Sequence, residues 1–246
     1  MRVLMLASFG LEIVECAGAL AKAIAAGDEV HAAVLLCRDT SRPQITAAAK
    51  VIGIEQVTYL NGVAGEIEVT PAAKMPIVRL LREFRPDVVI MQDPQHAQHD
   101  LDPDRRMIAL LYAESLAMSS RDWRIEECGG HAPHGIPTIY YMTPEHPNCV
   151  VEIEDVLEIK QRALDVLTDQ NTFSAQHWRE HASVETLARI APGWSPDDGD
   201  AELGRLGQRQ IFLALALSNG LGSHSGATLG EPYRREGTFL VDRLTE

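Results

Sequence analysis

Apolar residues along the chain occur in short continuous blocks separated by longer stretches with helical spacing. Residues 2–7 form one such block, which is typical of a buried strand. The alanine-rich residues 13–26 predict a helix that ends at Gly27, and residues 29–36 predict a second buried strand. A strand, a helix and a strand in this order favour two parallel strands joined by a right-handed crossover.

The same alternation continues through the rest of the chain. Thr70 and Pro71 predict the start of a helix that runs to about Phe84, because threonine is a good N-cap and proline suits the first helical position. Asp155 and Glu158 predict a capping box at the start of a later helix. The other expected strands cover residues 56–60, 87–91, 137–142 and 149–153, and the other expected helices cover residues 43–52, 105–118, 155–169, 175–191 and 201–217.

This order of elements predicts one α/β domain over residues 1–246. We expect a doubly wound, mainly parallel, Rossmann-like sheet with a helical addition at the C-terminal end. The glycine- and arginine-rich tail over residues 220–237 is expected to be a loop.

Composition narrows the classes of partner and the compartment. The formal net charge is -13, with 35 acidic and 22 basic residues, which argues against nucleic acid and anionic membranes as partners. The four cysteines show no C-x-x-C spacing, so we expect free thiols in a reducing compartment. The first apolar block is too short for a signal peptide and no apolar run reaches membrane-spanning length, so a cytoplasmic protein is expected.

Three loops follow predicted strands, where ligands bind in open parallel sheets: residues 8–12, 37–41 and 92–104. The third loop is dense in titratable groups. Histidine and carboxylate at this density indicate metal binding or acid–base chemistry, and a solvated polar loop is the alternative. The groups in this loop are Asp93, His96, His99, Asp100, Asp102 and Asp104.

Other histidines are less informative. His131 and His134 flank a proline in a glycine-rich segment that is typical of a mobile surface loop. His177 and His181 share one helix face, but with no third ligand near them in sequence we interpret that face as solvated. His224 lies in a loop that is placed to fold over a pocket.

Four segments, in this order, resemble motifs of the PIG-L/LmbE de-N-acetylase superfamily. Its members hydrolyse N-acetyl groups of amino sugars, and a related branch, the 4-oxalomesaconate hydratases, adds water to a C=C bond. The resemblance implies the fold predicted above and a homo-oligomer. The four segments are RVLMLASFGLEIVECAGALAKAIAAGDEVHAAVLL, RPDVVIMQDP followed by DPDRRMIA, IPTIYYMTPEHPNCVVEIEDVLEIKQRAL, and LGEPYRREGTF.

The resemblance also places the family's zinc site on particular residues. Ser8 and Leu11 stand where the family's A-H-P-D-D-E motif has two zinc ligands, and Gly10 stands where it has the general base. Arg105 aligns with the third ligand, the last histidine of H-P-D-H, and only Glu12 is retained. Leucine has no donor atom and arginine does not ligate metals, so no zinc or other cofactor is expected.

Two functions of different classes remain open. The first is an enzyme with zinc-independent hydrolase- or hydratase/lyase-type chemistry on a small polar metabolite, with Arg105 as the fixed positive charge. A variant of it keeps a metal ion held by His96, His99 and Asp102. The expected catalytic residues are His99, Asp100, Asp102 and Arg105, and the expected substrate-binding residues are Ser8, Glu12, Arg38, Asp93, His96, Asp104 and His224.

The second function is a non-catalytic relative that binds a ligand or pairs with an active homologue. The simultaneous loss of base and metal ligands motivates it. A conventional zinc-dependent N-deacetylase is a further alternative.

Overall fold

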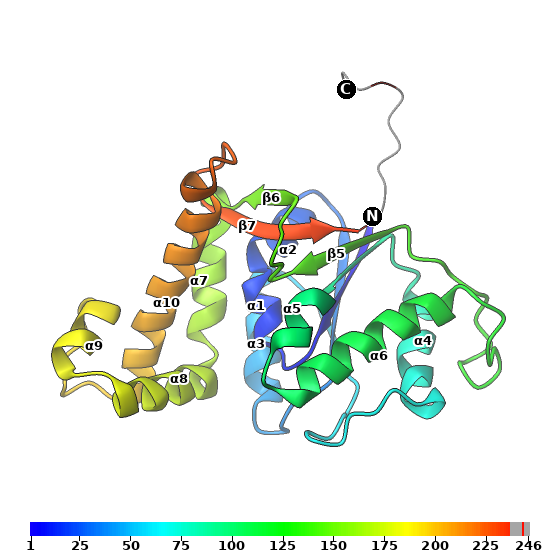
Figure 1. The fold of residues 1–246 in the computed structure, drawn as a ribbon, viewed down its shortest axis with the longest axis horizontal. Coiled ribbons are helices and arrows are strands. Elements are labelled where there is room, and N and C mark those ends of the chain that lie inside the picture. Colours follow the sequence, from blue (N-terminus) through cyan, green and yellow to red (C-terminus); the bar gives the residue numbers. More distant parts are fainter. Residues whose placement is uncertain (237–242, 244–246) are drawn as a thin grey trace.

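A seven-stranded sheet lies at the centre of the molecule, and Figure 1 shows its β5, β6 and β7 side. The order of the strands is β3-β2-β1-β4-β5-β7-β6. The structure is a computed structural model that describes residues 1–236 and 243. The first five strands in this order are parallel, and β7 is antiparallel to both β5 and β6. The predicted α/β fold with a mainly parallel sheet is confirmed. The strands are β1 (Arg2–Ala7), β2 (Glu29–Val34), β3 (Gln56–Tyr59), β4 (Val88–Gln92), β5 (Thr138–Met142), β6 (Cys149–Glu152) and β7 (Gly230–Arg235).

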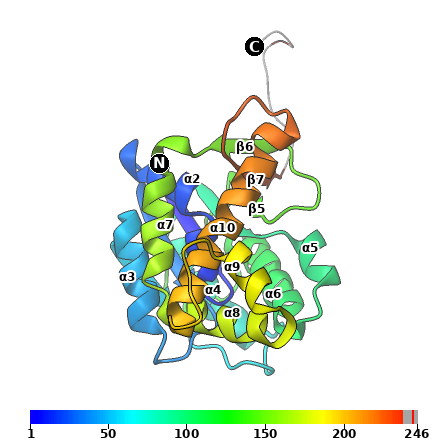
Figure 2. The same cartoon turned by 90° about the vertical axis from the view of Figure 1, so that its left-hand side faces the viewer.

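The helices fall into two layers and a C-terminal group (Figures 1 and 2). The α-helices are α1 (Leu11–Glu15), α2 (Ala17–Ala25), α3 (Arg42–Ile52), α4 (Pro71–Phe84), α5 (Pro94–His99), α6 (Pro103–Ser119), α7 (Leu157–Asp165), α8 (Thr168–His181), α9 (Val184–Ile190) and α10 (Asp200–Asn219). Two short 3₁₀ turns, η1 (Glu154–Val156) and η2 (Leu221–Ser223), complete the described elements.

Strand β1 is buried on both faces, as its continuous apolar sequence predicts. Met5 and Ala7 belong to the core formed with α1, α2, α3 and α7. Leu4 and Leu6 point the other way, into the core formed with α4 and α6. Successive side chains of a strand alternate between faces, so one strand supplies both cores. Its carboxyl end, next to those of β2 and β4, is thereby held in a fixed position.

Two of the predicted helices are each divided. Residues 13–26 are broken at Cys16, whose φ of -95° and ψ of 9° interrupt the helix between α1 and α2. The helix predicted over residues 175–191 begins earlier and is broken at Ala182, which is extended. Ser183 then caps α9 by accepting a hydrogen bond from the Thr186 backbone N–H. In both places a local backbone break overrides an otherwise continuous helical pattern.

The expected capping box at Asp155 is wrong. The helix begins after η1, with Val156 at the N-cap and no side-chain cap on α7 among the described residues. The Asp155 carboxylate instead lies 2.9 Å from the Lys22 ammonium on α2. At the start of α4, by contrast, Thr70 accepts a hydrogen bond from Ala73 N–H as predicted.

Two segments predicted to be loops contain regular structure. The segment over residues 92–104 contains α5, which Asp93 caps by accepting a hydrogen bond from the Gln95 backbone N–H. The tail over residues 220–237 contains β7, which fills the gap between β5 and β6. Gly237 and the last residues of the fourth family-like segment lie outside the described residues.

Other expectations concern cysteines and membranes. All four cysteines are free thiols. Among the described helices, none combines the length and the apolar character that crossing a membrane requires.

Helices α8 and α10 approach each other closely at two glycines of α10. A Cβ on Gly204 would lie 1.9 Å from the backbone oxygen of Asn171, and a Cβ on Gly207 would lie 2.3 Å from the Trp178 ring. Only glycine fits at such contacts. These two positions therefore set the distance between the helices of the C-terminal addition.

We predict that Gly204→Ala lowers the free energy of unfolding by about 2 kcal/mol or more, because the new methyl group meets backbone that cannot move aside cheaply. Gly135→Ala is the matched control, since a Cβ there would make only an ordinary contact of 3.7 Å. Urea unfolding measures both. Equal stability of the two variants would show that α8 and α10 are not held this tightly.

Candidate active site

The three loops predicted to form the site do line one cavity of about 810 Å³. It lies beyond the carboxyl ends of β1 and β2, at the start of α6, and the start of α8 closes its far side. The cavity is mixed in character, with aromatic, cationic and acidic side chains on its walls. Among its lining residues are Phe9, Arg38, Ser41, Asp102, Arg105 and Asp169.

The start of α6 places a carboxylate and a guanidinium, those of Asp102 and Arg105, side by side. Asp102 is the N-cap and accepts a hydrogen bond of 2.9 Å from the Asp104 backbone N–H, and Pro103 takes the first helical position. Arg105 follows Asp102 by three residues, a spacing that brings side chains together on a helix. Both side chains therefore face the main cavity.

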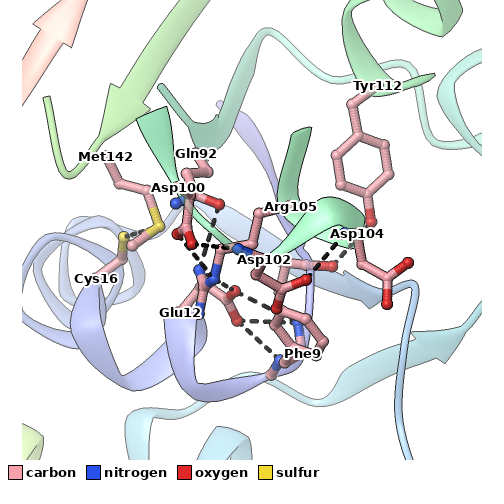
Figure 3. Close-up of polar contacts among 12 residues, drawn as sticks. Phe9, Glu12, Cys16, Gln92, Asp100, Asp102, Asp104, Arg105, Tyr112 and Met142 are labelled. Carbon is pink, nitrogen blue, oxygen red and sulfur yellow. Dashed lines mark hydrogen bonds and ion pairs between the residues drawn. The ribbon is translucent and has the colours of Figure 1, made fainter. Parts of the chain in front are cut away.

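The Arg105 guanidinium lies at the centre of a polar cluster (Figure 3). Its Nη1 is 3.5 Å from the Glu12 carboxylate and donates a 3.3 Å hydrogen bond to the Gln92 side-chain oxygen. Its Nε is 3.4 Å from the Asp100 carboxylate, and the group stacks over the Phe9 ring at 5.0 Å. Its Nη2 makes no polar contact within the described part of the chain. That nitrogen is available to a ligand in the cavity.

Glu12 is the buried partner of this cation. Its side chain is only 2% exposed. One carboxylate oxygen accepts hydrogen bonds from the backbone N–H groups of Gly10 (2.8 Å) and Phe9 (3.1 Å), which fixes the turn after β1. Gly10 has a φ of 104°, and a Cβ there would lie 2.6 Å from Ile45. A buried carboxylate needs a counter-charge, and among the described residues Arg105 provides it.

Glu15 is a titratable group that the sequence reasoning missed. It is half-buried, lines a second cavity of about 280 Å³, and has a pKa raised to about 7. Burial is the largest cause and the negative charge of Glu12 is the next, while the charges of Arg105 and Lys160 act in the opposite direction. Its spacing of three residues from Glu12 on a helix was the available signal.

A buried ion pair lines this second cavity. Lys160 lies 2.6 Å from Glu231, and both side chains are about 5% exposed. Glu231 also accepts hydrogen bonds of 2.8 Å from the backbone N–H groups of Gly18 and Ala19, and one of 3.0 Å from the Tyr233 hydroxyl. The lysine and the N-terminal end of α2 together compensate the buried carboxylate.

Several predicted site residues meet at the Arg105 cluster. Arg38, Asp102 and Arg105 line the main cavity, and Glu12 and Asp100 contact the guanidinium. Arg38 is exposed and makes no ion pair with other described residues. The structure thus gathers residues from all three predicted loops around one space.

Other predicted site residues have structural contacts instead. The Asp93 carboxylate is fully buried and accepts hydrogen bonds from Arg234 Nε at 2.8 Å and from Arg234 Nη2 at 2.9 Å. This contact raises the pKa of Arg234 further above its usual range. The Asp104 carboxylate accepts hydrogen bonds from the Gly65 backbone N–H. Ser8 is buried and is not among the residues that line the main cavity. Their expected roles in substrate binding remain predictions.

The predicted histidines do not gather at the cluster. His96 lines the second cavity, whereas His99 and His224 are exposed and line neither cavity. Among the described residues, one group of three possible metal ligands lies close together, on α8, with its ligand atoms within 4.8 Å of one another. The side chains of His96, His99 and Asp102, the alternative metal site, do not come together in this way.

The residues that the sequence resemblance aligns with the family's zinc motif carry few atoms that could ligate a metal ion. Gly10 and Leu11 offer no side-chain donor, and the Ser8 side chain is buried without a described polar partner. The guanidinium of Arg105 is a permanent cation that carries donors and no acceptor. Gly10, Leu11 and Arg105 therefore carry no side-chain atom that would ligate a metal ion.

We predict that Arg105→Ala lowers the free energy of unfolding by about 3 kcal/mol, because it leaves the Glu12 charge buried without a partner. The same change in a Glu12→Gln background should cost less, by at least about 1 kcal/mol, since no buried charge is then left. Urea unfolding of the wild type, Arg105→Ala, Glu12→Gln and the double variant measures the coupling energy between the two side chains. Strict additivity would contradict the pairing.

We also predict a pH-dependent effect of Glu15→Gln. The pKa of Glu15 is near 7 in the folded chain against an ordinary value of 4.5, so the folded state binds this proton more tightly. The contribution of Glu15 to the free energy of unfolding is therefore at its full value below about pH 4.5, and it is lost as the pH rises through 7. The variant should therefore gain stability relative to wild type across that window, by at most about 3 kcal/mol.

Unfolding free energies measured between about pH 4.5 and 8 test this, with the exposed Glu145→Gln as control. A stability difference between Glu15→Gln and wild type that does not change with pH would show that Glu15 titrates normally.

Comparison with known proteins places this geometry in a wider context. No family model matches the chain. It is 29% identical over 133 residues to the diacetylchitobiose deacetylase of Thermococcus kodakarensis, a match that covers 53% of this chain and 49% of that protein. The chain thus spans about half the length of this relative.

Solved structures match over nearly the whole chain. The N,N'-diacetylchitobiose deacetylase of Pyrococcus horikoshii superimposes with a TM-score of 0.70 at 19% identity, covering 96% of this chain and 83% of that one. The 4-carboxy-2-hydroxymuconate hydratase of Pseudomonas putida gives 0.66 at 15% identity, covering 99% of each. The resemblance inferred from the four sequence motifs is confirmed at the level of the fold: this chain has the PIG-L/LmbE fold shared by deacetylases and a hydratase.

Proposed function

We propose that this chain is an enzyme that adds water to, or hydrolyses, a small anionic metabolite without a metal ion, using Arg105 as its fixed positive charge. The observation that carries the proposal is the guanidinium held among Glu12, Asp100 and Gln92, in a residue that lines the cavity and whose Nη2 has no partner among the described residues. Proteins of the same fold include deacetylases and a hydratase, so both reaction classes are compatible with the scaffold.

Electrostatics favours a metal-free site. A guanidinium roughly 4 Å from a divalent ion would meet about 8 kcal/mol of repulsion at an effective dielectric near 20. The residues at the other two ligand positions, Ser8 and Leu11, do not offset this. A fixed cation in the same place supplies the charge stabilisation that a metal ion supplies in other hydrolytic enzymes.

The cavity contains the groups that both reactions need. Asp102, which lines the cavity, is placed to accept a proton from an attacking water. The oxygen on which negative charge develops, in either an amide tetrahedral intermediate or an enolate, would lie against Arg105 Nη2. Arg38, on the β2 side of the cavity, is free to bind a carboxylate or phosphate of the substrate.

A non-catalytic role as a ligand-binding protein is the second candidate. It is favoured by the structural use of two acidic groups in the third loop, since Asp93 binds Arg234 and Asp104 binds the Gly65 backbone. These contacts leave fewer side chains for acid–base work than the sequence indicates.

Two substitutions separate the candidates. Asp102→Asn should leave ligand affinity within about threefold and reduce turnover by about 10² to 10⁴, because it removes only the base. Arg105→Ala should weaken binding and turnover together, and Arg105→Lys should recover part of the binding. Probes are unsaturated di- and tricarboxylates, followed by loss of ultraviolet absorbance, and diacetylchitobiose, followed by acetate release.

The outcomes are distinct. Turnover that survives both Asp102→Asn and Arg105→Ala would contradict the proposed enzyme. Binding without turnover in the wild-type chain would favour the non-catalytic role. Zinc-dependent acetate release would instead identify a conventional deacetylase, and is best measured in a His177→Ala/His181→Ala background, where the exposed histidine pair on α8 is absent.

A further inference from the structure

The exposed C-terminal half of α8 carries a group of metal-ligating side chains outside both cavities. His177, Glu180 and His181 each offer one ligand atom, and these atoms all lie within 4.8 Å of one another. The two imidazole rings are 4.8 Å apart between centroids. We propose that these three residues form a surface site for a divalent transition-metal ion such as Zn²⁺ or Ni²⁺.

The spacing of the three residues explains why they converge. Positions i, i+3 and i+4 share one face of a helix. The segment HWREH has the H-x-x-E-H spacing with which one class of zinc peptidases presents two histidines from a helix. Here all three side chains are exposed, so the geometry supports ion binding on an open surface. The sequence interpretation of this face as solvated considered only the two histidines, and Glu180 offers the third ligand atom beside them.

The rest of α8 holds these side chains outward on a rigid helix. On its other face Ala175 is buried, and the Trp178 ring packs where Gly207 of α10 leaves room for it. The neighbouring cation, Arg179, is paired with Asp200 at 2.6 Å. Its charge is therefore partly compensated and does not oppose an ion at the outer face.

Charge and ligand type favour a transition-metal ion. The site lies in the last two turns of α8, where the helix dipole favours a cation, and the chain carries a net charge of -13. Two imidazoles and one carboxylate suit zinc, nickel or copper, whereas calcium and magnesium prefer oxygen ligands. Metal–ligand bonds of about 2 Å require the ligand atoms to close in slightly, which exposed side chains do by rotation.

This site is independent of the proposed enzyme. Asp169, at the start of α8, lines the main cavity, and Glu180 follows it by eleven residues. That spacing corresponds to about 16 Å along the helix axis. Metal binding here would leave the Arg105 cluster unchanged.

The test uses the full chain without an affinity tag, stripped with a chelator and titrated calorimetrically with ZnCl₂ and with NiCl₂ at about pH 7.5, where imidazole is mainly neutral. We expect one ion per chain. His177→Ala and His181→Ala should each weaken binding by at least about tenfold, Glu180→Gln should weaken it less, and His146→Ala, which removes an exposed histidine elsewhere, should leave it unchanged.

Because the three side chains are exposed, we expect each variant to be folded, and circular dichroism checks this. An absence of saturable binding to the wild-type chain would overturn the proposal. Binding of one ion that persists unchanged in the His177→Ala/His181→Ala variant would also overturn it, because the ion would then lie elsewhere.

Discussion

The contact between the Arg105 guanidinium and the buried Glu12 carboxylate determines the character of the candidate site. Glu12 holds the turn after β1 through two backbone N–H groups, and its charge requires a cation beside it. A metal ion would meet that need in a site with ligands, but Gly10 and Leu11 provide none. The arginine compensates the carboxylate from α6 and also lines the cavity. The turn, the cation and the cavity wall therefore depend on one another.

Such a cation has a different chemistry from a zinc ion. It stabilises negative charge and orients an oxyanion by donating hydrogen bonds, but it does not bind water as a ligand and lower its pKa. In the proposed enzyme, water activation falls to a carboxylate, and Asp102 at the start of the same helix is the one we assign to it. A substrate with its own negative charge would gain more from Arg105 and Arg38 than a neutral sugar would.

The sequence predicted the parts of the molecule that local periodicity and sheet topology control. Continuous apolar blocks identified β1 and β2, and the rule for strand ends predicted that three loops would share one cavity. It missed β7, because the strand contains Pro232 and lies in a glycine- and arginine-rich segment, a composition that is typical of a loop. The breaks at Cys16 and Ala182 depend on tertiary packing that helix propensity does not carry.

Residue roles were harder to predict, because they depend on contacts between distant segments. The density of acidic groups in the third loop indicated chemistry, yet Asp93 is committed to Arg234, 141 residues away. Glu15 was missed because its raised pKa comes from burial and from the neighbouring charge of Glu12. Glu180 was overlooked because the two histidines were considered as a pair.

A crystal grown with zinc and recorded at the zinc absorption edge tests the proposed replacement of a metal ion by an arginine most directly. An anomalous difference map should have no peak in the space among Ser8, Leu11 and Arg105, with the guanidinium in density beside Glu12. A strong peak in that space, with the Arg105 side chain turned away from Glu12, would contradict the central claim.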